Sequence, residues 1–267
     1  MPVRIVQSKQ NARFKELRRA LAQKKNRAAE VAGIEGPNLV AEAIRARIKV
    51  TCVFVGNTMQ DWLKTVHLPE QTETVIMPSA ILASVLATET PQPVAALVRP
   101  SEWTWNDVLG VGGYAAPLVL VLAGLQDPGN LGTILRSAEA FGTTGVVALP
   151  GTVNEWNPKA VRASAGSVFR MPLVAASVDE CFARLREAGV VVWTTATRNA
   201  TEATNADLAR AAAVVIGNEG NGVPREVALR TDHALTIRCP GAVESLNAAV
   251  AASVLLYEAA RQRRGAR

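Results

Sequence analysis

Cysteine and histidine are scarce in this chain of 267 residues, which limits its metal and redox chemistry. The three cysteines, Cys52, Cys181 and Cys239, are far apart, and His67 and His233 are the only histidines. No zinc-binding spacing can be assembled from these five residues. The cysteines are therefore expected to be reduced, buried thiols, as is typical of a cytoplasmic protein.

Long hydrophobic runs are also missing. Nearly half of the residues are apolar, which is ample for a buried core, but charges, Gly or Pro interrupt each run well short of a membrane span. No apolar segment follows the basic residues at the N-terminus, so no secretory signal is expected. No internal repeat or low-complexity tract is present. We therefore expect a cytoplasmic, non-membrane protein of one large domain or two smaller ones.

Positive charge is concentrated in the first fifth of the chain. Residues 1–50 contain twelve Lys and Arg but only four Glu, whereas the remaining residues contain seventeen basic and nineteen acidic side chains. The whole net charge of +6 therefore comes from this segment. Such asymmetry fits a polyanionic partner such as nucleic acid, but a solvated helix face explains it equally well.

The first hundred residues show alternating helical and strand patterns. The expected elements are helices from Asn11 to about Ala29, from Pro37 and at 79–87, and strands at 50–56, 74–77 and 93–98. This pattern predicts a small α/β domain over residues 1–100. Residues 101–116 have no clean period and are expected to be a linker, whose Trp103 and Trp105 pack against a domain face.

From Pro117 onward, near-continuous apolar strands alternate with helices. The expected elements are strands at 117–125, 145–149, 190–196, 212–217 and 234–238, and helices from Asn130, from about Asn157, at 178–188 and from Leu246. This pattern predicts an α/β domain over residues 117–267, with a parallel sheet covered on both faces. Ligands of such sheets bind in the loops at the carboxyl ends of the strands.

Three of these loops have unusual sequences. DPGNLGTILRSAEAFG (127–142) begins a helix with Asn130 at the N-cap, and Arg136 lies off the apolar stripe of that helix. Arg136 is thus either an ordinary exposed arginine or a functional one. IGNEGNGVP (216–224) is a Gly-rich turn, a weak signal on spacing alone. IRCPGAVESLNAAVAASVLLYEA (237–259) begins a helix rich in small residues.

Together and in this order, the three segments resemble the motifs of the SpoU (TrmH-like) branch of the SPOUT RNA methyltransferases. NLGTILRSAEAFG is similar to the first motif, IGNEGNGVP to the second and IRCPGAVESLNAAVA to the third. NPKAVRASAGSVFRMP (157–172) also matches an Arg-x-Ser-x-Gly stretch of the family. The resemblance covers the second half of the chain. Residues 1–100, with PQPVAALV (91–98) near their end, more loosely resemble the ribosomal-protein-like (L30e-like) substrate-binding domain of many members.

The resemblance implies a C-terminal trefoil knot, S-adenosylmethionine as the cofactor, and methylation of a ribose 2′-hydroxyl. By motif position, the reaction centre contains Asn130, Arg136, Glu219, Ser245 and Asn247, and the cofactor pocket contains Thr195, Gly217, Ile237 and Leu246. The resemblance also implies a homodimer built on the C-terminal domain, for which the alanine-rich start of the last helix offers small residues for close packing.

The 2′-hydroxyl distinguishes RNA from DNA, so RNA is the expected substrate. By analogy, the added N-terminal domain favours ribosomal RNA. Transfer RNA methylation and a non-catalytic RNA-binding protein of the same fold are the alternatives. A dinucleotide-dependent dehydrogenase, suggested by fold class alone, is disfavoured because no G-x-G-x-x-G follows the first strand of either domain. Arg136 is either a proton acceptor, which is awkward for a group that is nearly always protonated, or an anchor for phosphate and developing charge.

Overall fold

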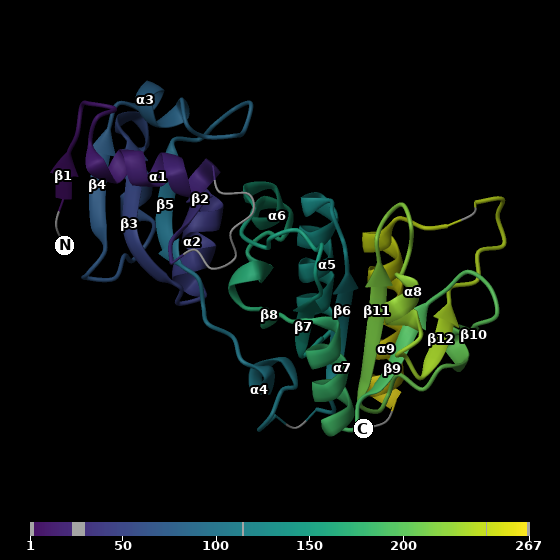
Figure 1. Cartoon of the computed structure of the whole chain (residues 1–267). Coiled ribbons are helices and arrows are strands. Elements are labelled where there is room, and N and C mark those ends of the chain that lie inside the picture. Colours follow the sequence, from purple (N-terminus) through teal and green to yellow (C-terminus); the bar gives the residue numbers. More distant parts are fainter. Residues whose placement is uncertain (1–2, 23–29, 114, 244, 266–267) are drawn as a thin grey trace. The chain divides into compact units, whose positions relative to one another are not determined.

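The computed structural model describes residues 3–22, 30–113, 115–243 and 245–265 (Figure 1). The chain divides into two compact units. The first comprises Met1–Glu102 together with Asn154–Phe169, and the second comprises Trp103–Val153 together with Arg170–Arg267. The first unit is therefore built from two separate stretches of the sequence.

The first unit contains a five-stranded mixed sheet with the strand order β1-β4-β3-β5-β2. Its strands are β1 (Val3–Ile5), β2 (Ala32–Glu35), β3 (Lys49–Gly56), β4 (Glu73–Met77) and β5 (Val94–Arg99). Strand β4 runs parallel to β1 and β3, and β5 runs antiparallel to β3 and β2. The helices are α1 (Ala12–Ala22), α2 (Pro37–Arg45), α3 (Ser79–Ala83), α6 (Pro158–Ala163) and the 3-10 helices η1 (Asn57–Lys64) and η2 (Ser167–Phe169).

Helix α1 forms because its apolar residues recur at helical spacing and bury one face against the sheet. Phe14 and Leu17 are buried there in one cluster with Phe54 of β3 and Leu97 of β5. The described part of the helix ends at Ala22, and the rest of the expected helix, residues 23–29, lies outside the described residues. Strands β1 and β2 were not expected, because three and four residues are too few to show a period.

The second unit contains a seven-stranded sheet in which every described pairing is parallel, with the order β10-β12-β9-β11-β6-β7-β8. Its strands are β6 (Leu118–Ala123), β7 (Gly145–Ala148), β8 (Leu173–Ala175), β9 (Val191–Thr195), β10 (Thr201–Glu202), β11 (Ala212–Gly217) and β12 (His233–Thr236). The helices are α4 (Trp105–Val108), α5 (Pro128–Ala140), α7 (Val178–Glu187), α8 (Arg225–Ala228), α9 (Ala248–Gly265) and the 3-10 helix η3 (Ala203–Asn205).

Both faces of this sheet are covered, which confirms the prediction of a buried parallel sheet. Val119 and Val121 of β6 pack in one cluster with Phe182 and Leu185 of α7. The alternate leucines of β6 are equally buried, so the opposite face is covered as well. Helices α5 and α9 pack against each other, with the hydroxyls of Ser137 and Ser253 2.7 Å apart.

Two helix starts differ from the expectation. Helix α5 begins at Pro128, and its N-cap is Asp127, whose side chain accepts a hydrogen bond from the N–H of Asn130 (2.9 Å). Placing the N-cap at Asn130 was therefore wrong. Aspartate followed by proline at the first helical position suits a helix start better. Helix α9 begins at Ala248, two residues after the expected Leu246.

The stretch 101–116, expected to be a linker, contains helix α4. Val108 at the end of this helix is fully buried in the second unit. Trp105 packs against the same cluster, and its Nε1 donates a hydrogen bond to Glu180 (3.0 Å). The prediction that Trp105 packs against a domain face is thus confirmed.

Two of the three cysteines are buried as expected. Burial raises the pKa of the Cys52 and Cys181 thiols to about 12 in both cases. Cys239 is only half-buried, so the expectation of a buried thiol was wrong at this position. Within the described ranges, no helix is both long enough and apolar enough to cross a lipid bilayer.

Arg263, near the end of α9, forms hydrogen bonds with two other segments of the second unit, residues 116–117 and 208–210. Its guanidinium donates hydrogen bonds to the main-chain carbonyls of Ala116 (2.5 Å), Pro117 (2.9 Å), Leu208 (2.9 Å) and Arg210 (2.6 Å). Only the planar, five-donor side chain of arginine can serve four carbonyls at once. The C-terminal helix is thereby attached to the segment that leads into β6.

Replacing Arg263 with Ala should lower the free energy of unfolding by about 2–4 kcal/mol, because four carbonyls lose a charged donor. The matched control is Arg264→Ala, whose exposed side chain forms no ion pair among the described residues and should cost less than about 0.5 kcal/mol. Urea unfolding measures the loss of stability in each variant as a shift of the urea concentration at the midpoint, with no change in the dependence of the unfolding free energy on urea. Equal midpoints for the two variants would contradict this role of Arg263.

Candidate active site

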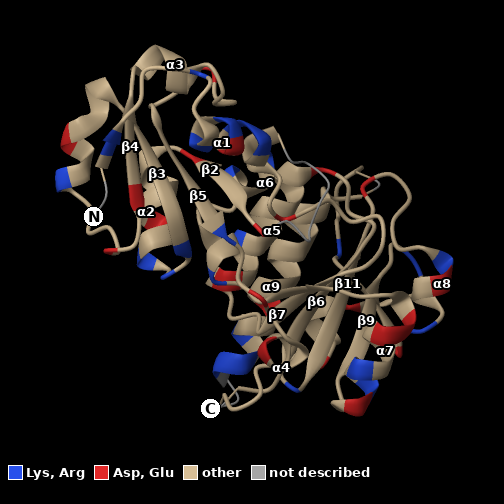
Figure 2. Ribbon diagram, turned by 60° about the vertical axis from the view of Figure 1, so that its left-hand side comes forward, with Lys and Arg blue, Asp and Glu red and all other residues tan. Residues whose placement is uncertain are grey.

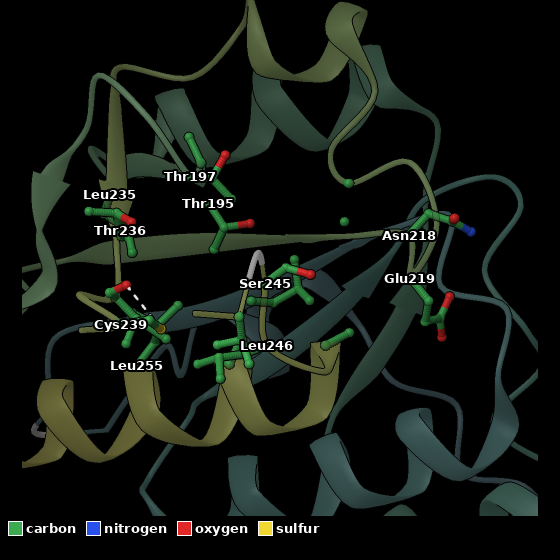
Figure 3. Close-up of a pocket in the computed structure, with 18 of the residues that line it drawn as sticks. Thr195, Thr197, Asn218, Glu219, Leu235, Thr236, Cys239, Ser245, Leu246 and Leu255 are labelled. Carbon is green, nitrogen blue, oxygen red and sulfur yellow. Dashed lines mark hydrogen bonds between the residues drawn. The ribbon is translucent and has the colours of Figure 1, made fainter. Parts of the chain in front are cut away.

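The carboxyl ends of β9, β11 and β12 border one cavity of about 690 Å³. This volume lies within the range of about 300–1,000 Å³ that is typical of small-molecule sites. The loops after β11 and β12 form much of the wall, and the first turns of α9 complete it. Asn218 and Glu219 lie at one end of the cavity and Cys239 at the other (Figure 3).

The side chain of Glu219 joins the loop after β11 to the loop after β6. Its Oε1 accepts hydrogen bonds from the N–H of Asp127 (3.0 Å) and from Nδ2 of Asn130 (3.0 Å). Its Oε2 accepts a hydrogen bond from the N–H of Gln126 (3.2 Å). A carboxylate is favoured there because the unpaired N–H groups at a helix N-terminus carry partial positive charge. Glu219 therefore binds the start of α5 from a distant part of the chain.

These contacts set the charge of Glu219. Burial alone would raise the pKa of Glu219, but the hydrogen bonds from Asn130 and from the main-chain N–H groups outweigh it, and the pKa lies below its ordinary value. The side chain is thus an ionised acceptor of three hydrogen bonds at neutral pH. Such a group suits the positioning of loops and does not suit proton donation.

Asn247 connects the third loop to the same network. Its Nδ2 donates a hydrogen bond to Oδ1 of Asn130 (3.1 Å), and its own Oδ1 accepts from the N–H groups of Ala249 (2.9 Å) and Val250 (3.3 Å). Asn247 therefore caps α9 while holding the start of α5. Glu219, Asn130 and Asn247 form one continuous chain of hydrogen bonds across the three motif loops.

Gly217 allows the loop after β11 to fold back tightly. A Cβ atom at this position would lie 2.1 Å from the carbonyl carbon of Gly222, a distance that no side chain tolerates. The main-chain groups of Asn218 and Gly222 exchange two hydrogen bonds of 2.9 Å across the turn. Glycine at position 217 is therefore required by the close approach of the backbone.

Comparison with known proteins points to the same family as the motifs. Residues 117–257, more than half of the chain, match the model of the SpoU rRNA Methylase family. The chain belongs to this family. Residues 11–96 match the MRM3-like substrate binding domain.

Several relatives of this SpoU family member span nearly its whole length. The 23S rRNA (guanosine(2553)-2'-O)-methyltransferase RlmP of Bacillus subtilis is 32% identical over 256 residues, which are 94% of this chain and 97% of the relative. The SpoU methyltransferase AviRb from Streptomyces viridochromogenes, solved in complex with the cofactor AdoMet, superposes with a TM-score of 0.83 at 28% identity, over 97% of this chain and 100% of that one. The AdoMet-bound rRNA methyltransferase from Sinorhizobium meliloti superposes with a TM-score of 0.84 at 27% identity, over 97% and 98% of the two chains.

The residues that the SpoU motifs assign to the cofactor all line the cavity. They are Thr195, Gly217, Ile237 and Leu246. The hydroxyl of Thr195 donates to the carbonyl of Val215 (2.9 Å), so its side chain is already engaged. Ser245 also lines the cavity, and its hydroxyl has no hydrogen-bond partner in the described part of the chain.

Arg136 stands apart from the other residues assigned to the reaction centre. It lies six residues after Asn130, roughly 9 Å farther along the axis of α5 at 1.5 Å per residue, and its side chain is exposed. Among residues 3–22, 30–113, 115–243 and 245–265, it has no ion-pair or hydrogen-bond partner. A single chain therefore leaves this cation available to an external anion.

Sequence reasoning missed two residues of the site. Asp127 caps α5, and the Asp-Pro-Gly sequence is a readable signal for that role. Asn218 binds the loop after β6 through a contact between residues 94 positions apart, and no local pattern reveals it.

Proposed function

We propose that this SpoU family member transfers the methyl group of S-adenosylmethionine to a ribose 2′-hydroxyl of ribosomal RNA. The observation that carries the proposal is the joining of three motif loops beside one cavity by Glu219, Asn130 and Asn247. Membership of the SpoU family supports the reaction, and the relative named as a 23S rRNA 2'-O-methyltransferase supports the substrate class.

The lining of the cavity fits S-adenosylmethionine by its chemistry. Leu246 and Leu255 offer an apolar wall suited to an adenine ring, and Thr197 and Ser245 offer hydroxyls suited to a ribose or an amino-acid group. When bound, the cofactor supplies a methyl group activated on a sulfonium. We expect Thr195, Gly217, Ile237 and Leu246 to hold it, chiefly through main-chain groups.

Methyl transfer requires the site to align the ribose oxygen, exclude water and favour loss of the hydroxyl proton. The Arg136 guanidinium is nearly always protonated, so its proposed role is to bind an RNA phosphate and stabilise negative charge as it develops on the 2′-oxygen. Glu219 and Asn130 hold the loops in place. Ser245 and Asn247 shape the rim of the cavity.

Replacing Arg136 with Ala should separate chemistry from folding and cofactor binding. Stability should change by less than about 0.5 kcal/mol, because the side chain is exposed. Cofactor affinity should stay near that of the wild type, because Arg136 does not line the cavity. The rate of methyl transfer in a single turnover, at saturating RNA and cofactor, should fall at least about a hundredfold.

The matched control is Arg186→Ala, which removes the same charge from the exposed face of α7 and should leave the rate unchanged. Arg136→Lys should rescue poorly, because lysine keeps the charge but loses the planar fork. A near-normal rate for Arg136→Ala would show that this arginine is an ordinary surface residue.

We also propose a division of labour along the chain. Residues 1–100 bind the RNA substrate, residues 101–116 link the two domains, and residues 117–267 catalyse methyl transfer. Helix α1 carries basic residues (Figure 2), has no acidic residue in its first turn, and lies within the match to the substrate binding domain. Arg18 and Arg19 are exposed and Lys15 is half-buried, and none of the three forms an ion pair among the described residues. Unpaired cations on one helix suit the phosphates of a nucleic acid.

Replacing Lys15, Arg18 and Arg19 with Gln should weaken RNA binding and flatten its salt dependence. Each lost phosphate contact removes about 0.7–0.9 from the slope of log affinity against log salt, so loss of all three should reduce the slope by about two to three. Filter binding over a range of salt concentrations measures this slope. The control replaces Arg184, Arg186 and Arg230 of the second unit with Gln, and an equal slope for both triple variants would refute the assignment.

A homodimer is the third part of the proposal. Three large apolar side chains are exposed on one face of α9, namely Val250 (49%), Val254 (40%) and Tyr257 (54%). Two of the alanines at the start of α9, Ala249 and Ala252, are buried within the unit itself and do not reach its surface. The stripe Val250–Val254–Tyr257 is therefore the surface that we propose is covered by a second copy.

Light scattering at micromolar concentration should show a dimer for the wild-type protein and a monomer for Val254→Arg, because the change places a charge in the centre of the stripe. Val111→Arg is the control, since Val111 is equally apolar and is 68% exposed after α4. A monomeric wild-type protein with full activity would remove the proposal.

Two further expectations complete the proposed function. The trefoil knot implied by the family likeness would involve the chain from β11 to α9, and the sheet order supports it, since β11 lies between β6 and β9 while β12 lies beyond β9. The proposed place of action is the cytoplasm, because ribosomal RNA is the proposed substrate.

A further inference from the structure

Asn218, which directly precedes Glu219, uses all of its polar groups. Its side-chain Nδ2 donates to the carbonyl of Gly124 (2.9 Å), and its Oδ1 accepts from the N–H groups of Gly220 (2.8 Å) and Asn221 (3.2 Å). Its main-chain N–H and carbonyl are paired with Gly222. The side chain therefore closes its own loop and also attaches that loop to the end of β6.

The loop after β11 is rich in glycine, so it needs side-chain hydrogen bonds to hold one conformation. Gly217, Gly220 and Gly222 lie within six residues, and Gly222 has a φ of +67°. Glycine has more backbone freedom than any other residue, so a loop of this kind has many conformations of similar energy. The Asn218 side chain, which binds two N–H groups and one carbonyl, stabilises a single one of these loop conformations.

The loop that receives this contact is fixed at the same point. Gly124 follows β6 with a φ of +77°, and its N–H donates to Oγ1 of Thr152 (3.2 Å) while its carbonyl accepts from Asn218. Two and three residues later, the N–H groups of Gln126 and Asp127 donate to Glu219. The two loops are thus joined by two adjacent side chains, those of Asn218 and Glu219.

We propose that Asn218 is a positioning residue for methyl transfer, acting through Glu219. It aims the Glu219 carboxylate at Gln126, Asp127 and Asn130, and its own amide is turned away from the centre of the cavity (Figure 3). This inference rests on the proposed function, because it assigns Asn218 a part in the same reaction. It requires no contact between Asn218 and the RNA.

The first test compares Asn218→Ala with Asn106→Ala, a control at an exposed asparagine that has no side-chain hydrogen bond among the described residues. Methyl transfer is assayed with labelled S-adenosylmethionine and ribosomal RNA. Relative to the wild-type protein, Asn218→Ala should lower kcat by about tenfold to a hundredfold, since misplacement of a site residue by about 1 Å costs that much. KM for the RNA should change by less than about threefold, because the RNA-binding surface is elsewhere. Asn218→Asp should rescue poorly, because it keeps the acceptor but loses the donor to Gly124. Asn106→Ala should leave kcat unchanged, and a normal kcat for Asn218→Ala or Asn218→Asp would overturn the inference.

A double-mutant cycle distinguishes positioning from general support of the fold. In a Glu219→Ala background, Asn218→Ala should lower kcat by less than about twofold, because the group it positions is already gone. Losses that multiply would show that Asn218 does not act through Glu219.

Amide hydrogen exchange gives a readout that needs no activity. In Asn218→Ala, exchange should accelerate at Gln126 and Asp127 as well as at Gly220 and Asn221, because Glu219 no longer holds the first pair. Faster exchange confined to Gly220 and Asn221 would overturn the inference. A wild-type protein without methyl transfer would instead refute the proposed function, and the exchange result would still decide the role of Asn218.

Discussion

The ionised carboxylate of Glu219 is bound to the N-terminal turn of α5, and the geometry of the candidate site depends on that contact. The side chain comes from the loop after β11, two of its donors come from the loop after β6, and the third is Nδ2 of Asn130 in the first turn of α5. Asn130 in turn accepts a hydrogen bond from the side chain of Asn247, which caps α9. A carboxylate can serve in this way because burial, which would raise the pKa of Glu219, is outweighed by the hydrogen bonds from the Asn130 side chain and from main-chain N–H groups. Three loops that are remote in the sequence are thereby joined beside the cavity, whose lining includes the loops after β11 and β12.

In the proposed reaction, the cavity for the cofactor and the arginine that acts on the RNA are separate parts of the site. Most residues that line the cavity are small, hydroxyl-bearing or apolar, whereas the one arginine that the motifs assign to the reaction lies outside it on an exposed helix face. The exposed side chain of Arg136 takes no part in the packing of α5, and it is suited to an anionic substrate because a guanidinium binds phosphate in a fixed geometry. In the proposed reaction, this guanidinium would meet its anionic partner only when RNA is bound. That division suits a transfer reaction whose cofactor is a small molecule and whose substrate is a large polyanion.

The sequence predicted the parallel sheet and most of its strands because these strands are continuously apolar and long enough to show it. It did not predict β8 or β10, since three and two residues carry no period. The site residues were predicted by the order of three motifs, whereas spacing alone was a weak signal. The structure supplies what no local pattern contains, above all the contact between Asn218 and Gly124. The half-buried state of Cys239 was also not predictable, because it depends on a cavity formed by loops that meet only in three dimensions.

The proposed methylation of a ribose in ribosomal RNA can be tested by mapping 2′-O-methyl groups in cellular RNA. Ribosomal RNA from cells with and without the gene is compared by resistance of each ribose to alkaline cleavage, which requires a free 2′-hydroxyl. The account predicts that one ribose methyl group is missing without the gene and returns with the wild-type protein but not with Arg136→Ala. Identical methylation profiles with and without the gene would contradict it.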